Sequence, residues 1–278
     1  MRYLIGTNIK MYLGYRESLR WLADMNRDVP ETYLVEVALF PPMLSLVNGR
    51  DLISKNNVSL GAQNVCWSHE GPYTGEISPL VLRELGIPYA ELGHHERRLH
   101  FNETDRTVAK KISAALFCGL KALVCVGEDA DRRDSGAEEF ARDQIQALLA
   151  SNSDAPPERL VVAYEPRWAI GVAEAAPPEH ARRCCDAIRG KLVEIFGPRN
   201  GREIRIIYGG SVKLEDAADM LEQKNINGLF IGRAALDTKN FAKVVKIAAR
   251  QAEADQKGGG AARRPASKKP RAAKKPRL

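Results

Sequence analysis

Three ionisable side chains, Lys10, His94 and Glu165, each follow a short apolar or β-branched run in the 278-residue chain. A carboxyl group whose pKa is raised toward the working pH by burial can act as a general base, which contributes about 10²–10⁴-fold in rate. Imidazole and ammonium groups can stabilise negative charge that develops on an oxygen atom. If the fold brings these three residues together, they can carry out acid–base chemistry.

Two groups of small residues could bind an anion. Gly209-Gly210-Ser211 and Gly232-Arg233 also follow apolar runs. Glycine allows backbone N–H groups to approach a phosphate closely, and such sites often lie beside a helix N-terminus. One Gly-Gly pair alone would be weak evidence, so the prediction of a phosphate site depends on both groups lying at the same end of the fold.

The apolar runs are short, and longer amphipathic stretches separate them. Each pair of parallel strands needs a crossover that a helix can supply, so this alternation predicts a parallel sheet. Eight strand–helix units fit a closed (β/α)8 barrel better than an open sheet. The expected strands are Tyr3–Thr7, Leu34–Phe40, Val58–Ala62, Tyr89–Leu92, Ala122–Val126, Leu160–Tyr164, Ile204–Tyr208 and Gly228–Ile231. The expected helices are Arg16–Met25, Met43–Val47, Pro79–Leu85, Asp105–Phe117, Glu138–Leu149, Pro178–Phe196, Leu214–Leu221 and Thr238–Ala249.

The functional residues of such a barrel gather where the strands end and the following loops begin. Seven of the eight expected strands end in polar, charged or glycine-rich groups. The barrel interpretation therefore predicts that Lys10, His94 and Glu165 meet at the C-terminal face, with both glycine groups on the two strands where a phosphate site belongs.

The chain divides into a single barrel domain, residues 1–252, and a basic tail, residues 253–278. From Lys257 to Leu278 there are nine Lys or Arg and no acidic residue, which is typical of disorder. The remainder has 42 − 9 = 33 basic and 35 acidic residues, a formal charge of 33 − 35 = −2. The overall charge of +7 therefore does not indicate that the barrel binds nucleic acid. The tail is either a solvated extension or a weak binder of nucleic acid or another polyanion.

The cysteine pattern and the apolar segments indicate the compartment. Five cysteines at irregular spacing, with no CxxC motif, favour reduced thiols over a zinc site or disulfides. The first residues, MRYLIGTNIK, are too short an apolar run for a signal peptide, and no stretch approaches the roughly 18 apolar residues of a membrane span. We expect a soluble cytoplasmic protein.

Several blocks of the sequence resemble, in the right order, the triosephosphate isomerase family over about residues 3–250. AYEPRWAIG (Ala163–Gly171) resembles the family's AYEPxWAIG signature at the catalytic glutamate and its lid. LGHHERR (Leu92–Arg98) resembles LGHSERR, and CVGE (Cys125–Glu128) and IYGGSV (Ile207–Val212) also match. The chain is thus similar to TIM-barrel isomerases that interconvert aldose and ketose phosphates.

The resemblance implies a role for each ionisable candidate. In this family a proton moves between adjacent carbons of a phosphorylated hydroxy-ketone through an enediolate. Glu165 would be the base, and His94 would donate from a neutral imidazole to the carbonyl oxygen. Lys10 would stabilise the enediolate, and Asn8 would bind the substrate or hold Lys10. A glutamate that only caps a strand, a structural histidine and a surface lysine are the alternatives.

The resemblance also implies how the substrate is held. Backbone groups of Gly171, Ser211, Gly232 and Arg233 would bind the phosphate near a short helix after the last strand. The segment Pro166–Ala176 would be a lid that excludes water and protects the enediolate. No metal or organic cofactor is implied.

A homodimer is a further implication of the resemblance. The loop Asn64–Ile77 resembles the family's interdigitating loop, and Thr74 occupies the position that reaches the neighbour's active site. A self-contained loop is the alternative.

The sequence departs from the family pattern around the site. The substituted positions are Ile9 for a tryptophan, His95 for a serine, Asn102 and Arg233 for glycines, and Val172-Ala173-Glu174 for Thr-Gly-Lys. These changes leave the ionisable residues in place and alter the walls of the site, a pattern that suits a paralogue acting on a related substrate. From the family resemblance as a whole we expect triose phosphate isomerisation, as in glycolysis and gluconeogenesis. Two alternatives remain open: interconversion of L-erythrulose 1-phosphate and D-erythrulose 4-phosphate in erythritol catabolism, and a non-catalytic barrel that binds a sugar phosphate or polyanion.

Overall fold

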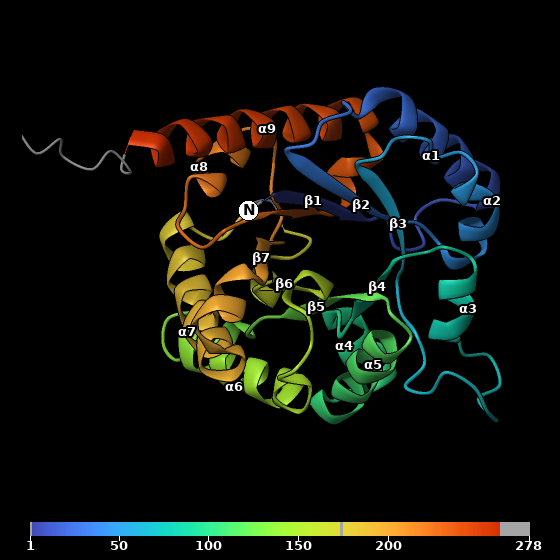
Figure 1. Cartoon of the computed structure of the whole chain (residues 1–278), viewed down its shortest axis with the longest axis horizontal. Coiled ribbons are helices and arrows are strands. Elements are labelled where there is room, and N and C mark those ends of the chain that lie inside the picture. The colour runs from blue at the N-terminus through green and yellow to red at the C-terminus, as the bar shows by residue number, and fades with distance from the viewer. Residues whose placement is uncertain (1, 173–174, 262–278) are drawn as a thin grey trace, which may run out of the picture.

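The computed structural model describes residues 2–172 and 175–261. Eight parallel strands close into one barrel in sequence order, with β8 paired to β1 (Figure 1). This confirms the predicted (β/α)8 TIM barrel, and each strand end lies within one residue of its expected position. The strands are β1 (Tyr3–Asn8), β2 (Val35–Phe40), β3 (Val58–Ala62), β4 (Tyr89–Leu92), β5 (Lys121–Val126), β6 (Leu160–Tyr164), β7 (Arg205–Tyr208) and β8 (Gly228–Ile231).

The helices form a ring outside the strands (Figure 1). Among the described residues, none is long and apolar enough to cross a membrane. The helices are α1 (Tyr15–Asp28), α2 (Leu46–Arg50), α3 (Pro79–Glu84), α4 (His95–Phe101), α5 (Asp105–Phe117), α6 (Ala137–Leu149), α7 (Pro178–Glu203), α8 (Ala217–Leu221) and α9 (Thr238–Ala261).

Helix α4 has no counterpart among the expected helices. None of its side chains is buried, so its sequence, HERRLHF, lacks the apolar periodicity by which an amphipathic helix is recognised. It begins because His94 caps it: the ring atom Nδ1 accepts a hydrogen bond from the backbone N–H of Glu96.

The two-residue period of the strands explains which side chains reach the site. Alternate residues face the barrel interior, and on β6 these are Val161 and Ala163, whereas the residues between them pack against the helices. Continuing this alternation one step past the strand brings Glu165 to the interior at the open end. On β1 the same pattern leads from Leu4 to Asn8. The strands therefore fix the direction of the functional side chains.

A buried ion cluster closes the opposite end of the barrel. Glu36 on β2 accepts hydrogen bonds from Arg205 on β7, Lys121 on β5 and Tyr89 on β4, at 2.7, 2.7 and 2.8 Å. Burial alone would raise the pKa of Glu36, but the charges of Arg205 and Lys121 outweigh burial and hold it at about 2. The cluster thus ties four strands together across the barrel.

The C-terminal helix extends beyond the expected domain boundary. Helix α9 continues past residue 252 to Ala261, and Asp255 accepts a hydrogen bond of 2.8 Å from the Tyr3 hydroxyl. Residues 253–261 of the expected tail are therefore helical. The remainder of that tail, with most of its basic residues, lies outside the described residues.

Helix α7 contains a break that matches the sequence prediction. Gly197 has a φ of 80°, outside the helical range, and Pro198 follows it. The helix expected to end at Phe196 therefore ends there in its regular geometry, and a second helical segment continues to Glu203.

The ion cluster generates a prediction about stability. Glu36→Gln should lower the free energy of unfolding by about 3 kcal/mol at pH 7, because it leaves Arg205 buried without its counter-charge. A carboxyl group whose folded pKa is depressed contributes stability above its unfolded pKa, and this contribution is lost as pH falls toward the folded value. The difference between wild type and variant, measured by urea unfolding, should therefore shrink below about pH 4.5.

Glu138→Gln is a matched control, because Glu138 pairs with Arg183 on the exposed surface. Solvent screens that pair, so its loss should cost much less. Equal losses in the two variants would show that the cluster does not stabilise the barrel in the way described.

Candidate active site

A cavity of about 260 Å³ opens at the C-terminal ends of the strands. All eight residues expected to form the site line it, although they lie at or after the ends of five different strands of the barrel. They are Asn8, Lys10, His94, Glu165, Gly171, Ser211, Gly232 and Arg233. The structure therefore brings these eight positions together around one cavity.

The carboxyl group of Glu165 lies at the floor of this cavity. Glu165 is only 4% exposed, and its carboxyl atom Oε2 has no hydrogen-bond partner. Burial, with the nearby negative charge of Glu91 as the next cause, raises the pKa of Glu165 well above its ordinary value. A carboxylate in this setting is a stronger base than one in water and is free to accept a proton.

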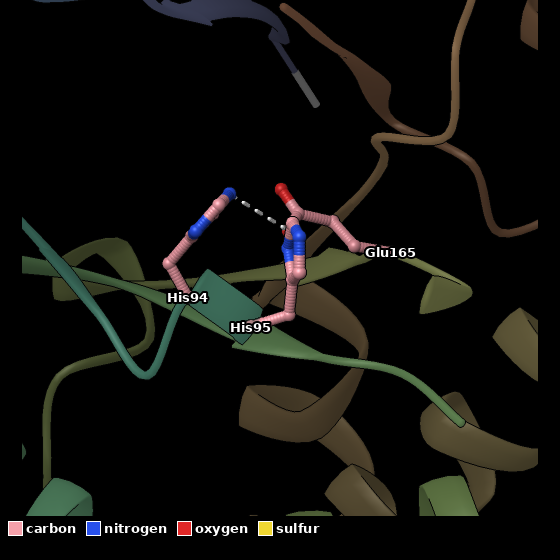
Figure 2. Close-up of side chains that lie close together, drawn as sticks. All are labelled: His94, His95 and Glu165. Atoms are coloured by element: carbon pink, nitrogen blue, oxygen red, sulfur yellow. Dashed lines mark ion pairs between the residues drawn. The ribbon is translucent and has the colours of Figure 1, made fainter. Parts of the chain in front are cut away.

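The imidazole of His94 faces Glu165, with 3.7 Å between His94 Nε2 and Glu165 Oε2 (Figure 2). Burial, with the neighbouring His95 and Lys10 as further causes, lowers the pKa of His94 well below its ordinary value. Because Nδ1 accepts the N–H of Glu96, the proton of the neutral ring lies on Nε2. His94 is therefore a neutral donor that points into the cavity.

Lys10 and Asn8 form the wall at the end of β1. The side-chain oxygen of Asn8 accepts the backbone N–H of Lys10 at 2.6 Å and holds Lys10 in the left-handed region, with a φ of 50°. The ammonium group of Lys10 pairs with Glu96 at 2.5 Å. A fixed positive charge thus lies at the edge of the cavity.

The opposite side of the cavity is built from small residues and backbone. Gly171 and Ser211 have φ angles of 71° and 44°, and the short 3-10 helix η6 (Arg233–Leu236) begins directly after Gly232. The guanidinium of Arg233 lies 5.3 Å from the centre of the Tyr12 ring. Small residues, a helix start and a cation are features that can bind phosphate.

His95 lies next to His94 and Glu165 (Figure 2). Its ring centre is 4.4 Å from that of His94, and its atom Nδ1 is buried without a hydrogen-bond partner. Burial, followed by the charge of Lys10, lowers the pKa of His95 to about 4. At neutral pH the ring is therefore uncharged and does not neutralise Glu165.

The segment expected to be a lid is anchored at both ends. The Trp168 indole donates a hydrogen bond of 2.8 Å to Glu128, which also accepts bonds from Tyr164. At the other end the backbone N–H of Ala176 donates to the Tyr208 hydroxyl at 2.8 Å. Residues 173 and 174, at the tip, lie outside the described residues.

Two further residues at the site were not singled out from the sequence. Glu91 accepts a hydrogen bond of 2.7 Å from the side-chain N–H of Asn8, and the thiol of Cys125 lies 3.8 Å from the same carboxyl group. The only signal for Glu91 was a charged residue inside an expected strand, on the same face as Tyr89.

Three groups of side chains among the described residues could ligate a metal. They are His94, His95 and Glu165; Glu128, His180 and Cys184; and Glu91, Cys125 and Glu165. Two of these groups contain Glu165 and belong to the cavity floor, and the third anchors the lid. The expectation that the protein needs no metal stays a prediction.

A closed barrel with a buried carboxyl group, a neutral imidazole and an ammonium group around one cavity defines an acid–base enzyme of the (β/α)8-barrel class. The comparisons with known proteins narrow this class. Residues 3–248 match the family model described as triosephosphate isomerase. The chain belongs to the triosephosphate isomerase family, whose members interconvert aldose and ketose phosphates.

Individual relatives agree with the family match. The chain is 40% identical to the triosephosphate isomerase of Solibacter usitatus over 245 residues, which cover 88% of this chain and 98% of the relative. It is 37% identical to that of Thermoanaerobacter pseudethanolicus, with the same coverage. It is 38% identical to that of Carboxydothermus hydrogenoformans, over 87% of this chain and 97% of the relative.

The environment of His94 generates a prediction about its ionisation. His94 should remain neutral, with the proton on Nε2, from pH 8 down to pH 5, because burial and its charged neighbours lower its pKa. Nitrogen-15 NMR of histidine-labelled protein measures both the protonation state and the tautomer, and a His94→Gln variant assigns the signals. A ring that becomes charged near its ordinary pKa of 6.5 would contradict this description of the site.

Proposed function

We propose that the protein interconverts dihydroxyacetone phosphate and glyceraldehyde 3-phosphate by proton transfer through an enediolate. One observation carries the proposal: the unpaired carboxyl oxygen of buried Glu165 faces the donor atom of His94 at 3.7 Å. A base and a hydrogen-bond donor at this spacing can act on adjacent atoms of one small substrate.

Glu165 is the proposed base of the first step. It removes a proton from the carbon next to the carbonyl group, and the electrons move onto the carbonyl oxygen to give the enediolate. The hydroxyl proton on the first carbon then moves to the former carbonyl oxygen, with the Nε2–H of His94 as the donor to that oxygen, and protonated Glu165 returns its proton to the carbon that carried the carbonyl, which leaves the aldehyde. The raised pKa of Glu165 supports this role, because it brings the proton affinity of the carboxylate closer to that of the substrate carbon.

His94 and Lys10 are proposed to stabilise the charge that develops on oxygen. A neutral Nε2–H donates to the carbonyl oxygen without first losing a proton to Glu165, which a charged ring at that distance would do. The ammonium group of Lys10 adds a positive charge in a site that burial makes sensitive to electrostatics. Asn8 holds the backbone of Lys10 in the required conformation.

The phosphate is proposed to lie on the other side of the cavity. Backbone N–H groups of Gly171, Ser211, Gly232 and Arg233 would bind its oxygens, and the guanidinium of Arg233 would add charge. The lid segment would close over the bound phosphate and exclude water, so that the enediolate is protonated before it can lose phosphate.

The substrate proposal follows the family and its retained ionisable residues. Every relative compared above carries the name triosephosphate isomerase, which supports triose phosphates and a place in glycolysis. No finding supports the tetrulose phosphates, and the buried Glu165–His94 pair argues for catalysis over binding alone.

Replacing the proposed base gives the direct test. Glu165→Gln should lower kcat for dihydroxyacetone phosphate by at least about 10³-fold, because the carboxamide cannot accept a proton. In wild type, kcat/KM should fall on the acidic side with a midpoint above the ordinary carboxyl pKa of 4.5, because burial raises the pKa of the base. A coupled dehydrogenase assay from pH 5 to 9 measures both.

Arg233→Ala is the matched control, because Arg233 lines the same cavity without touching the reacting carbons. It should raise KM and leave kcat nearly unchanged. L-erythrulose 1-phosphate in the same assay tests the other substrate. Equal activity of wild type and Glu165→Gln would reject the proposed mechanism, and a preference for the tetrulose phosphate would reject the substrate.

We also propose that the protein is a homodimer through the loop Asn64–Ile77. In Figure 1 this segment, between β3 and α3, extends away from the barrel. The backbone N–H of Cys66 donates to the carbonyl of Ile77 at 2.8 Å and closes the base of the loop. Trp67 and Tyr73 pack edge to face at 5.8 Å and remain 42% and 37% exposed. Aromatic side chains presented in this way favour an interface in which Thr74 approaches the neighbour's site.

The dimer has a defined mass, 2 × 30.7 = 61.4 kDa. Sedimentation equilibrium should give this value, and Tyr73→Asp should shift the protein toward the monomer because a charge would be buried in the interface. Tyr33→Asp changes an 80% exposed side chain elsewhere and should leave the dimer intact. A wild-type protein that is monomeric at all concentrations would reject the proposal.

We propose the cytoplasm as the location of the protein. All five cysteines are free, and four of them are buried. Unpaired thiols are typical of a reducing compartment.

A further inference from the structure

Glu91 is a second carboxyl group beneath the cavity floor. It lies on β4, where the strand period places it on the interior face with Tyr89, and it is fully buried. It does not line the cavity and so cannot touch a substrate. The proposed proton transfer gives it no role, yet burying a carboxyl group is costly unless it is neutral or paired.

The contacts of Glu91 connect it to the wall of the site. Its atom Oε2 accepts a hydrogen bond of 2.7 Å from Asn8 Nδ2. The amide oxygen of Asn8 accepts the N–H of Lys10 at 2.6 Å, where the backbone has a φ of 50°. Both ends of the Asn8 amide are hydrogen-bonded, so the bond from its Nδ2 to Glu91 fixes the orientation of the amide. This orientation in turn supports the strained backbone of Lys10.

Glu91 is also close to the base. The thiol of Cys125 donates to Glu91 Oε1 at 3.8 Å, and ligand atoms of Glu91, Cys125 and Glu165 all lie within 4.8 Å of one another. Two carboxylates at this separation in a buried site repel each other strongly, so one of them stays protonated. Burial raises the pKa of both groups, that of Glu91 to about 8. Glu91 is the one enclosed away from the cavity, whereas Glu165 lines it, and this placement assigns the retained proton to Glu91. The other groups whose charges or hydrogen bonds act on Glu91 are Asn8, Lys10, Glu96 and Cys125.

We propose that Glu91 is a positioning residue: as a neutral carboxylic acid it fixes the amide of Asn8 and the backbone of Lys10, and it leaves the negative charge of the cavity floor to Glu165. The kinetic consequences of this inference rest on the proposed function, whereas its consequence for the stability of the fold is independent of that function.

Two substitutions separate the hydrogen bond from the charge. Glu91→Gln keeps an acceptor for Asn8 without an ionisable group, so at pH 7 its kcat/KM should stay within about threefold of wild type. Glu91→Leu removes the acceptor, and the freed Asn8 and Lys10 should lower kcat/KM by about 10–100-fold. Equal losses in the two variants would show that Glu91 acts as an anion, and full activity of Glu91→Leu would show that it positions nothing.

The dependence of kcat/KM on pH above neutrality tests the charge of Glu91, because a loss of packing alone would not change this dependence. Above about pH 8 wild-type Glu91 ionises beside Glu165, and a second negative charge opposes formation of the enediolate. The kcat/KM of wild type should therefore fall relative to that of Glu91→Gln as pH rises from 7 to 9.5. Parallel profiles would overturn the charge part of the proposal.

Thermal unfolding tests the neutral state without any assay of activity. Between the ordinary carboxyl pKa of 4.5 and about 8, native Glu91 holds a proton that the unfolded chain has released, so stability decreases as pH rises. The Tm of wild type should therefore fall relative to that of Glu91→Gln between pH 5 and 8.

Glu36→Gln is the control for this measurement. Its carboxyl group has a depressed pKa, so its difference from wild type should stay constant between pH 5 and 8. A constant difference for Glu91→Gln as well would overturn the inference. If the expected Tm trend appeared but no variant or wild type isomerised triose phosphates, the proposed function would fail and the neutral state of Glu91 would stand.

Discussion

In the proposed mechanism, the desolvation of one carboxyl group controls the chemistry of this protein. Glu165 is buried with an unpaired oxygen, a state that costs roughly 1–3 kcal/mol for the acceptor alone. The same burial raises its pKa and gives it the basicity that proton transfer from carbon requires. The surroundings preserve this state, because His94 and His95 are uncharged at neutral pH and cannot neutralise it. Lys10, whose positive charge acts on Glu165, is paired with Glu96.

The rigid barrel supplies the stability that offsets the free-energy cost of burying Glu165. The closed ladder of eight strands fixes the direction of every side chain at its open end, and the ion cluster around Glu36 locks four strands at the other end. The residues of the site are far apart in sequence, yet each needs only its place at a strand end to reach the cavity. Stability is therefore concentrated at the bottom, while the strained and desolvated groups gather at the top.

Local sequence rules were sufficient for most of the fold and for the candidate site. The apolar runs and their separation predicted all eight strands, and the polar residues after them predicted Asn8, Lys10 and Glu165 at the cavity. Helix α4 could not be predicted in this way because it buries no side chain. Glu91 was missed because its importance comes from Asn8, 83 positions away, and the continuation of α9 depends on a contact with Tyr3. Such long-range pairings leave no local pattern.

Exchange of the substrate proton with solvent is the measurement that addresses the central claim most directly. Wild-type protein and dihydroxyacetone phosphate would be incubated in D₂O and followed by proton NMR, with Glu165→Gln as the reference. If buried Glu165 carries the proton through an enediolate, deuterium should enter the substrate and the product at the carbons beside the carbonyl group, and the variant should show almost none. Partial retention of the original hydrogen agrees with direct return of the proton by Glu165. Isomerisation or exchange unaffected by the loss of Glu165 would contradict the account.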